Sequence, residues 1–316
     1  MAKRVSIIVI TYNAGDDLKE CLDSLEKQDY YEKEIVVVND ASTDGTQEFL
    51  QHFKNQTEVE MITVTNENNF GVAGARNVGI RHATGEIIAF TDSDCVADSK
   101  WVSELVRAYD HEGVAAAGGR ILDDRVDNVW KRSSRGLNHV SVSEGYVSYI
   151  QGCNMSFKSE ILRQYYFNDE IKYGYEETLL CDYMIADGHK IYYNPEAIVH
   201  HKHKADLRSL LRQKYLRGVS SVWYRQKQHK FFMLKRHLVL LIAVLLIPFA
   251  AISTVLLYLS LALMMVFFAG LFRDEVLFGR KNIFDILMTF PFLIFIELFH
   301  FAGACAGIVK FKILRQ

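Results

Sequence analysis

Residues 87–94 read Ile-Ile-Ala-Phe-Thr-Asp-Ser-Asp, an apolar run that ends in two carboxylates one residue apart. The run is apolar on both faces and β-branched at its start, which is typical of a buried strand. In an open α/β sheet, ligands bind beyond the carboxyl ends of the strands. Asp92 and Asp94 would lie at that edge on one side of the chain, where their oxygens suit Mg²⁺ or Mn²⁺ shared with substrate phosphates. Alternatively, the two residues are ordinary caps of a turn.

The first 120 residues alternate strand and helix patterns. The patterns predict strands over 5–11, 35–38, 59–64 and 87–90, and helices over 16–28, 46–53 and 72–82. This alternation predicts an α/β, Rossmann-like fold whose mostly parallel sheet is covered on both faces. The usual dinucleotide and nucleoside-triphosphate signatures are absent, because neither Gly-x-Gly-x-x-Gly nor a P-loop pattern follows the first strand.

Charge and hydropathy divide the chain further along. The formal net charge of the 316 residues is −2, which gives no signal for nucleic-acid binding. Residues 202–236 carry eleven Lys or Arg against the single acid Asp206, and no charged residue occurs over the 35 positions 238–272. We expect an α/β domain over 1–203, a basic amphipathic interface segment over 204–236 and a transmembrane region of two or three helices over 237–316.

These segments also predict a location. The apolar run 5–10 is too short for the core of a signal peptide, and basic residues flank the first apolar stretch. We therefore expect a multi-pass protein of the cell membrane with a cytoplasmic catalytic domain. The basic segment would contact an anionic membrane surface.

Polar residues gather at the ends of the predicted strands. They form the segments Thr11-Tyr12-Asn13, Asn39 to Gly45, Gly71 to Asn77, and Asp92-Ser93-Asp94. In this order and at these intervals, the segments resemble the openings of family 2 glycosyltransferases of the GT-A fold. Those openings typically carry Thr-Tyr-Asn, Asp-Gly-Ser-Thr-Asp-Gly-Thr, Ala-Arg-Asn-x-Gly and Asp-x-Asp. The resemblance covers roughly residues 4 to 203.

The resemblance implies a donor site for a nucleotide-diphosphate sugar, with a UDP-sugar expected. Asp40 would accept the imide hydrogen of uracil, Arg76 would reach the base or a phosphate oxygen, and Gly71 would let backbone approach the ligand. Asp40 could instead be a turn-forming residue, and Gly71 a helix-start glycine. The expected donor-binding residues are Thr11, Tyr12, Asn13, Asp40, Gly71, Arg76, Asp92, Ser93, Arg212 and Arg217.

Two of these residues, Arg212 and Arg217, lie in the basic segment. Their guanidinium groups could clamp the diphosphate, or they could bind anionic lipid headgroups instead. The stretch 212–218 loosely matches the Gln-x-x-Arg-Trp motif of processive relatives but lacks the tryptophan. This difference argues against a polymerising synthase.

The acceptor side of the site is implied by two later segments. Residues 152–157 resemble the family's Gly-x-Asn-x-x-Phe segment, so Gly152, Asn154 and Met155 would contact the acceptor, although the segment could be only a strand-end turn. At 174–180 the family usually carries Glu-Asp, whose Asp is the general base.

Here Glu177 takes the position of that Asp. Its extra methylene moves the carboxylate, so Glu176 is the alternative base, although two acids that merely start a helix would also fit the pattern. Repulsion between the adjacent carboxylates should raise one pKa towards a useful range.

Asp94 and Asp92 would hold the metal, Mn²⁺ or Mg²⁺, that neutralises the leaving nucleotide. Residues 194–199 precede three histidines and resemble the family's Pro-Glu-Ala-x-Val-x-His strand. We expect His200 as a third ligand, because imidazole suits Mn²⁺. The alternative is that these are surface histidines in a basic patch.

The sequence therefore predicts a metal-dependent, inverting glycosyltransferase of glycan or polysaccharide biosynthesis, anchored in a membrane. It would move a sugar to a hydroxyl of a lipid-linked glycan or glycolipid. A polyprenyl-phosphate glycosyltransferase is the first alternative, but its anionic acceptor would need no base at Glu176 or Glu177. A non-catalytic, nucleotide-binding membrane scaffold is the second alternative.

Overall fold

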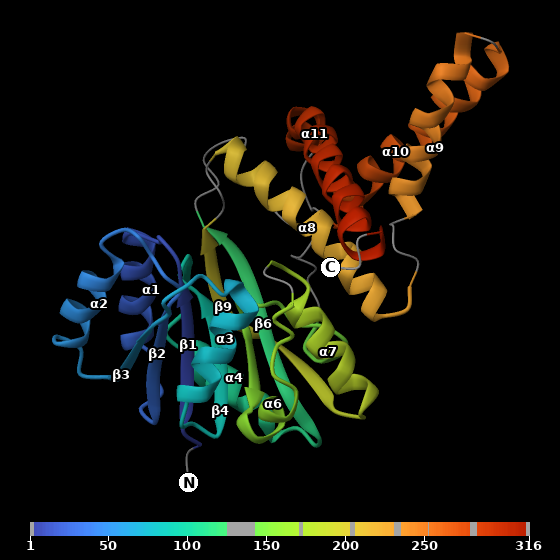
Figure 1. Ribbon diagram of the computed structural model, residues 1–316. Coiled ribbons are helices and arrows are strands. Elements are labelled where there is room, and N and C mark those ends of the chain that lie inside the picture. Colours follow the sequence, from blue (N-terminus) through green and yellow to red (C-terminus); the bar gives the residue numbers. More distant parts are fainter. Residues whose placement is uncertain are drawn as a thin grey trace. The chain divides into compact units, whose positions relative to one another are not determined.

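The computed structural model describes residues 3–124, 143–170, 173–202, 206–230, 235–251, 253–278 and 283–313. These residues fall into two compact units, the first ending at Lys202 and the second containing the helices from α8 onward (Figure 1). The expected division at 203 and 236 into three functional segments stays a prediction.

The strands and helices predicted for the first 92 residues all form, with small differences at their ends. They are β1 (Val5–Thr11), α1 (Asp16–Glu26), β2 (Lys33–Asn39), α2 (Thr46–Lys54), β3 (Glu60–Thr65), α3 (Gly71–His82) and β4 (Ile87–Asp92).

The first unit continues with shorter elements. They are β5 (Cys95–Ala97), α4 (Trp101–Arg107), η1 (Ala108–Asp110), β6 (Val114–Asp124), β7 (Gly145–Val147), β8 (Met155–Lys158), α6 (Ser159–Tyr165), α7 (Glu176–Ala186) and β9 (Lys190–Lys202).

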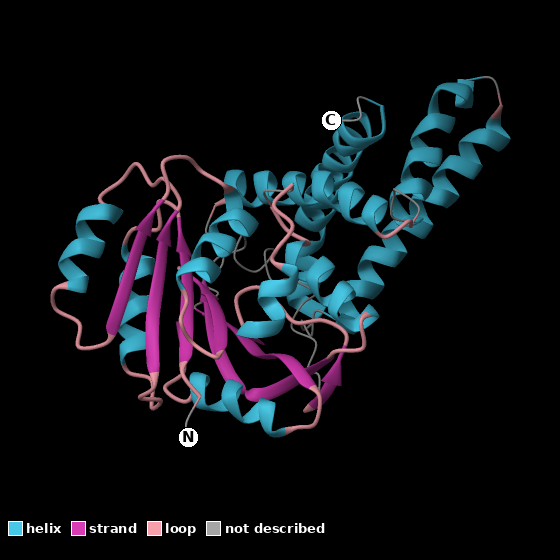
Figure 2. Cartoon of the chain, turned by 60° about the horizontal axis from the view of Figure 1, so that its bottom comes forward, coloured by secondary structure: helices cyan, strands magenta, loops and turns pink. Residues whose placement is uncertain are grey.

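Within the described residues, one nine-stranded sheet has the order β3-β2-β1-β4-β8-β6-β9-β5, and β7 pairs with β9. The strands are drawn as magenta arrows in Figure 2. Neighbouring strands from β3 to β4 are parallel, as expected. Beyond β4 the expectation of a mostly parallel sheet is wrong, because β8 runs antiparallel to both β4 and β6, and β5 and β7 run antiparallel to β9. The fold is therefore mixed α/β.

Alternate residues of the strands point to opposite faces of the sheet, and each face carries a hydrophobic core. Ile7 and Val37 belong to one cluster, with apolar residues of α1, α2 and α4. Ile8 and Val36 belong to the other, with residues of α3, α6 and α7. Because successive side chains of a strand point to opposite faces, strands that are apolar at every position bury both faces.

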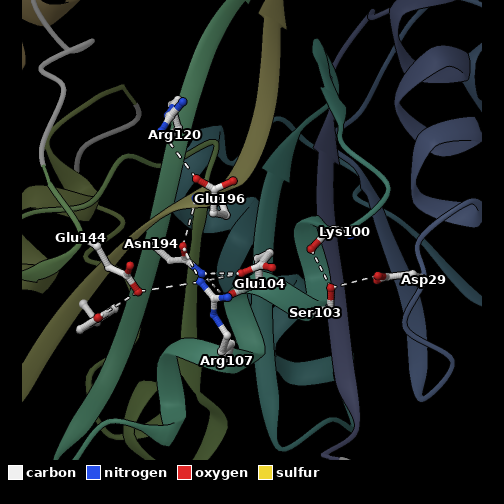
Figure 3. A network of polar contacts seen from close by, with 10 residues as sticks. Asp29, Lys100, Ser103, Glu104, Arg107, Arg120, Glu144, Asn194 and Glu196 are labelled. Carbon is white, nitrogen blue, oxygen red and sulfur yellow. Dashed lines mark hydrogen bonds and ion pairs between the residues drawn. The ribbon is translucent and has the colours of Figure 1, made fainter.

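Strand β9 contains a bulge that α4 holds in place. Gly119 pairs with Asn194 and Arg120 with Ile198, so residues 195–197 have no counterpart in β6. Asn194 donates from Nδ2 to the main-chain oxygen of Glu104 at 2.8 Å and to Glu104 Oε2 at 2.9 Å (Figure 3). A Cβ atom on Gly119 would collide with the carbonyl oxygen of Ala197, so the bulge needs glycine there.

The structure gives Asn154 and Met155 a structural role, and it does not support their expected contact with the acceptor. Asn154 is fully buried and donates from Nδ2 to the carbonyl oxygens of Ala197 at 2.8 Å and Arg120 at 3.0 Å. Its Oδ1 accepts from Trp101 Nε1 at 2.8 Å. Met155 is fully buried in the core on the α3 face. Neither side chain is accessible to a substrate.

The second unit consists of α8 (Leu207–Lys227), α9 (Lys235–Leu246), η2 (Ile247–Ala251), α10 (Thr254–Phe278), α11 (Ile283–Ile308) and a terminal π turn (Val309–Ile313). Helices α8 and α11 approach each other closely through glycines. A Cβ on Gly218 would collide with the His300 carbonyl oxygen, and one on Gly303 with that of Tyr215.

The expected transmembrane region, and with it the expected multi-pass protein of the cell membrane, is wrong. No helix within the described residues is both long enough and apolar enough to cross a bilayer. Helix α9 illustrates the reason, because it has 12 residues and gives way to a 3₁₀ turn around Pro248. Its rise of about 18 Å falls short of the roughly 30 Å hydrocarbon core.

Replacing Asn154 by alanine should destabilise the first unit. The change leaves the Trp101 indole N–H and two carbonyl groups without a partner, at a cost on the order of 3 kcal/mol in the free energy of unfolding. Urea unfolding followed by circular dichroism measures this cost. Asn55→Ala, at an exposed position after α2, is the matched control and should change stability little. Equal stabilities of the two variants would contradict a structural role for Asn154.

Candidate active site

Arg76 joins the two ends of the candidate site. Its side chain is 2% exposed on α3, and its NH1 donates to Glu176 Oε1 at 2.8 Å. Its NH2 donates to Asp92 Oδ1 at 3.2 Å and to the carbonyl oxygen of Gly152 at 3.1 Å. The carboxyl end of β4 and the start of α7 are therefore tied by one buried guanidinium. The expected contact of Arg76 with a base or phosphate stays a prediction. Its three protein acceptors show that Arg76 also has a structural role, which is to hold these segments together.

The two acids that contact Arg76 have shifted pKa values. Burial raises the pKa of Asp92, Arg76 opposes the shift, and the neighbouring Asp94 adds to it. Burial raises the pKa of Glu176 to about 8, and the charge of the adjacent Glu177 acts in the same direction. The repulsion expected within the Glu176–Glu177 pair therefore raises the pKa of Glu176.

Glu177 lies in a different environment from Glu176. It accepts a hydrogen bond on Oε1 from the Tyr149 hydroxyl at 3.1 Å, and its Oε2 has no hydrogen-bond partner among the described residues. Gly174 and Tyr175 both have positive φ, 75° and 72°, directly before α7. A left-handed tyrosine is strained, and such strain is often found where a turn must aim functional side chains.

Asp40 holds the start of α3. Its Oδ1 accepts from Asn66 Nδ2 at 2.8 Å and from the Phe70 backbone N–H at 3.0 Å, and its Oδ2 accepts from the Gly71 N–H at 2.9 Å. Gly71 has φ 76°, a value that favours glycine. Three internal bonds give Asp40 a structural role as a cap, and a contact with uracil through a remaining lone pair stays a prediction.

The Thr11-Tyr12-Asn13 segment is tied to the loop that follows β2. The Asn13 N–H donates to Ser42 Oγ at 3.0 Å, and Asn13 Oδ1 accepts from the Thr43 N–H at 2.8 Å. Tyr12 is half exposed, as a stacking residue would be. Thr11 is buried, and its Oγ1 has no partner in the part of the chain that the structure describes.

The structure places His201, and not His200, beside the second aspartate of the Asp-Ser-Asp segment. His201 Nε2 lies 3.5 Å from Asp94 Oδ1, and these atoms and Cys95 Sγ lie within 4.8 Å of one another. His200 Nε2 instead lies 3.2 Å from Asp98 Oδ1.

The cause is the pairing of β5 with β9. His201 is opposite Cys95, the residue after Asp94, and neighbouring residues of a strand point to opposite faces. The group around Asp94 contains neither His200 nor Asp92. Asp92 Oδ1 instead accepts from Arg76, and the expected roles of His200 and Asp92 as ligands have no support in this geometry.

The group of Asp94 and His201 fits a divalent cation. A carboxylate and an imidazole together suit Mn²⁺, and Mg²⁺ prefers a site made of oxygen ligands. Cys95 is a poor ligand, because burial raises the pKa of its thiol well above the usual value. The site therefore offers two protein ligands and leaves the other positions to a substrate.

Arg212 and Arg217 lie on α8 of the second unit, so their expected contact with the diphosphate stays a prediction. Arg212 is exposed and lines a cavity of about 580 Å³ with Leu207, Leu211 and Phe299. Ser93 is half-buried between the two aspartates, and its expected role also stays a prediction.

Sequence reasoning missed three residues of this site. His201 was one position from the chosen histidine, and counting Pro-Glu-Ala-x-Val-x-His from Pro195 ends on His201. Tyr149 belongs to no quoted motif. Asn66, which donates a hydrogen bond to Asp40, belongs to no pattern in the sequence that would have identified it.

Residues 6–180 match the family model described as Glycosyl transferase family 2. The GalNAc(5)-diNAcBac-PP-undecaprenol beta-1,3-glucosyltransferase of Campylobacter jejuni is 30% identical over 181 residues, which are 56% of this chain and 58% of that protein. The matched part of the chain spans between 15% and 58% of the length of eight of its curated relatives.

Two solved structures share the fold. The mannosyltransferase PcManGT from Pyrobaculum calidifontis, in complex with GDP-Man and Mn²⁺, has a TM-score of 0.64 and 20% identity over 98% of this chain and 88% of that chain. Staphylococcus aureus TarS 1–349, in complex with UDP-GlcNAc, has a TM-score of 0.54 and 17% identity over 98% and 92%. The fold is therefore GT-A-like, and because the family model covers more than half of the chain, this protein belongs to glycosyl transferase family 2.

Proposed function

We propose that the chain transfers a sugar, with inversion, from a nucleotide-diphosphate donor to a hydroxyl group of a lipid-linked glycan or glycolipid. The observation that carries this proposal is the buried link Asp92–Arg76–Glu176, which joins the carboxylates after β4 to the acid pair of α7. A donor site and a general base thereby belong to one rigid arrangement. We propose a UDP-sugar as donor, in keeping with the sequence motifs.

Asp94 and His201 would hold a divalent cation, which when bound would offset the negative charge that develops on the departing nucleotide diphosphate. The known complexes of PcManGT and TarS contain a nucleotide sugar, and that of PcManGT contains Mn²⁺ as well. These ligands support a donor of the same chemical class here.

Glu177 is the proposed general base. The acceptor oxygen forms a bond to C1 of the sugar, the bond from C1 to the diphosphate oxygen breaks, and the hydroxyl proton passes to Glu177. Tyr149 orients this carboxylate through Oε1, and Oε2 makes no other hydrogen bond among the described residues. Glu176 is a positioning residue, because its Oε1 accepts from Arg76.

The acid pair also supports one acceptor class over the other. A phosphate acceptor is already an anion and needs no base, whereas a hydroxyl must lose its proton. Two buried carboxylates at the start of α7 are costly to maintain without such a task. They therefore favour a hydroxyl acceptor over a polyprenyl phosphate, and an enzyme over a nucleotide-binding scaffold.

The two adjacent histidines of β9 give a matched test of the metal site. His201→Ala should raise the Mn²⁺ concentration for half-maximal UDP release at least about tenfold, since even partners of metal ligands change metal affinity that much. His200→Ala should leave this concentration unchanged, because its ring faces Asp98. An equal effect of both variants, or a larger effect at His200, would refute the assignment.

The two glutamates of α7 should respond differently to amide substitution. Glu177→Gln should lower kcat for sugar transfer by about 100-fold or more while UDP affinity stays the same, because only the proton acceptor is lost. Steady-state transfer assays and calorimetric UDP titration measure the two quantities. A larger loss of kcat in Glu176→Gln than in Glu177→Gln would assign the base to Glu176 instead.

Folding stability should depend on the protonation of Glu176. Its pKa rises from 4.5 to about 8 in the folded protein, so its contribution is fully present below pH 4.5 and is lost as the pH rises through 8. The thermal midpoint of the wild type should therefore fall between pH 5 and 8 more steeply than that of Glu176→Gln. Glu160→Gln, at an exposed position on α6, should keep the wild-type slope. Parallel pH profiles for Glu176→Gln and the wild type would contradict a raised pKa.

A further inference from the structure

A second group of metal-ligating side chains lies in the helical unit, apart from the proposed transferase site. His237 of α9 and Glu297 and His300 of α11 place one ligand atom each within 4.8 Å of the others. His237 Nε2 lies 2.9 Å from Glu297 Oε1 and 3.3 Å from His300 Nδ1. His237 is fully buried, and His300 is 7% exposed.

The hydrogen bonds among the described residues leave one buried atom of His237 without a partner. One nitrogen, His237 Nε2, faces both a carboxylate oxygen and a ring nitrogen. If Nε2 carries the proton, a single N–H must serve two acceptors; if it does not, the proton lies on Nδ1. His237 Nδ1 is buried and has no hydrogen-bond partner among the described residues. In either neutral tautomer Nδ1 of His237 therefore lacks a partner among the described residues, and Nε2 faces two neighbouring groups at once.

The separations match those of ligands around one zinc ion. Zn²⁺ binds imidazole nitrogen and carboxylate oxygen at about 2.0–2.2 Å, so two ligands of a tetrahedral site lie about 3.3 Å apart. The distances of 2.9 and 3.3 Å from His237 Nε2 are close to this value. Two imidazoles and one carboxylate form a common three-residue ligand set for Zn²⁺, which leaves a fourth position for water.

The surroundings favour a bound cation over an open polar cluster. The three residues come from helices that are otherwise largely apolar, and Phe301 packs edge-on against His237 at a centroid distance of 5.6 Å. A carboxylate in such surroundings is costly unless a cation or hydrogen bonds compensate it. The side chain of Glu297 is 12% exposed.

We propose that His237, Glu297 and His300 bind a structural Zn²⁺ ion that fastens α9 to α11. The ligand atoms are His237 Nε2, a carboxylate oxygen of Glu297 and His300 Nδ1. Zinc binding would then stabilise the helical unit by mass action, since the ion binds the folded chain and the unfolded chain offers no assembled site.

The test measures zinc on the full chain in an Asp94→Ala background, which removes the other candidate cation site. After dialysis against micromolar ZnSO₄ and then metal-free buffer, elemental analysis should find one zinc per chain. Added zinc should also raise the thermal midpoint by several degrees. Co²⁺ in place of Zn²⁺ should give the visible absorption of a tetrahedral site.

Two further variants in this background locate the ion. His237→Ala and the nearly isosteric Glu297→Gln should each lower zinc affinity at least tenfold and remove the zinc-dependent shift. His82→Ala, at an exposed position on α3, should bind zinc like its parent. If His237→Ala does not fold, Glu297→Gln decides the outcome. Absence of zinc from the Asp94→Ala protein, or unchanged affinity in Glu297→Gln, would overturn the proposal.

Discussion

The buried guanidinium of Arg76 sets the constraint on which the candidate site depends. Its three acceptors come from β4, from the loop before β8 and from α7. A guanidinium removed from water is costly unless it is paired with good geometry, so these segments must meet around it. Two carboxylates share this one cation, and burial raises the pKa of both Asp92 and Glu176. One electrostatic requirement thus fixes the spacing between the carboxyl end of β4 and the start of α7.

Periodicity predicted the parallel part of the sheet because its strands are buried on both faces. Val5–Thr11 and Lys33–Asn39 have apolar centres and are buried at nearly every position, and helices with clear apolar faces lie between such strands. The antiparallel part of the sheet has a much weaker periodic pattern in its sequence. Strands β5 and β7 have three residues each and β8 has four, too few for a period to be recognised. Their pairing depends on contacts far apart in sequence, and no local pattern records those contacts.

Motifs located the residues of the site better than they assigned the roles. Asn154 has the polarity of a pocket residue, yet its amide group is hydrogen-bonded to Trp101 and to two carbonyl groups, one of them in the bulge of β9. The partners of Arg76 are 16, 76 and 100 residues away, so no spacing rule could have found them. His201 differs, because its strand motif did contain the signal. Which face a histidine of β9 occupies follows from the pairing with β5, and spacing alone does not supply that pairing.

The helical unit shows how composition and structure differ. The uncharged stretch 238–272 suggested membrane crossings, and in the structure it comprises most of α9, a 3₁₀ turn and much of α10. Close contact between α8 and α11 depends on glycines at 218 and 303, and the first of them packs against the backbone of His300. Both units therefore bury polar or charged side chains, and each such side chain needs a partner that offsets the cost of removing it from water. In the first unit Arg76 supplies the positive charge that two acids need. In the second unit His237, Glu297 and His300 place one ligand atom each within 4.8 Å of the others, an arrangement that suits the zinc ion proposed for it.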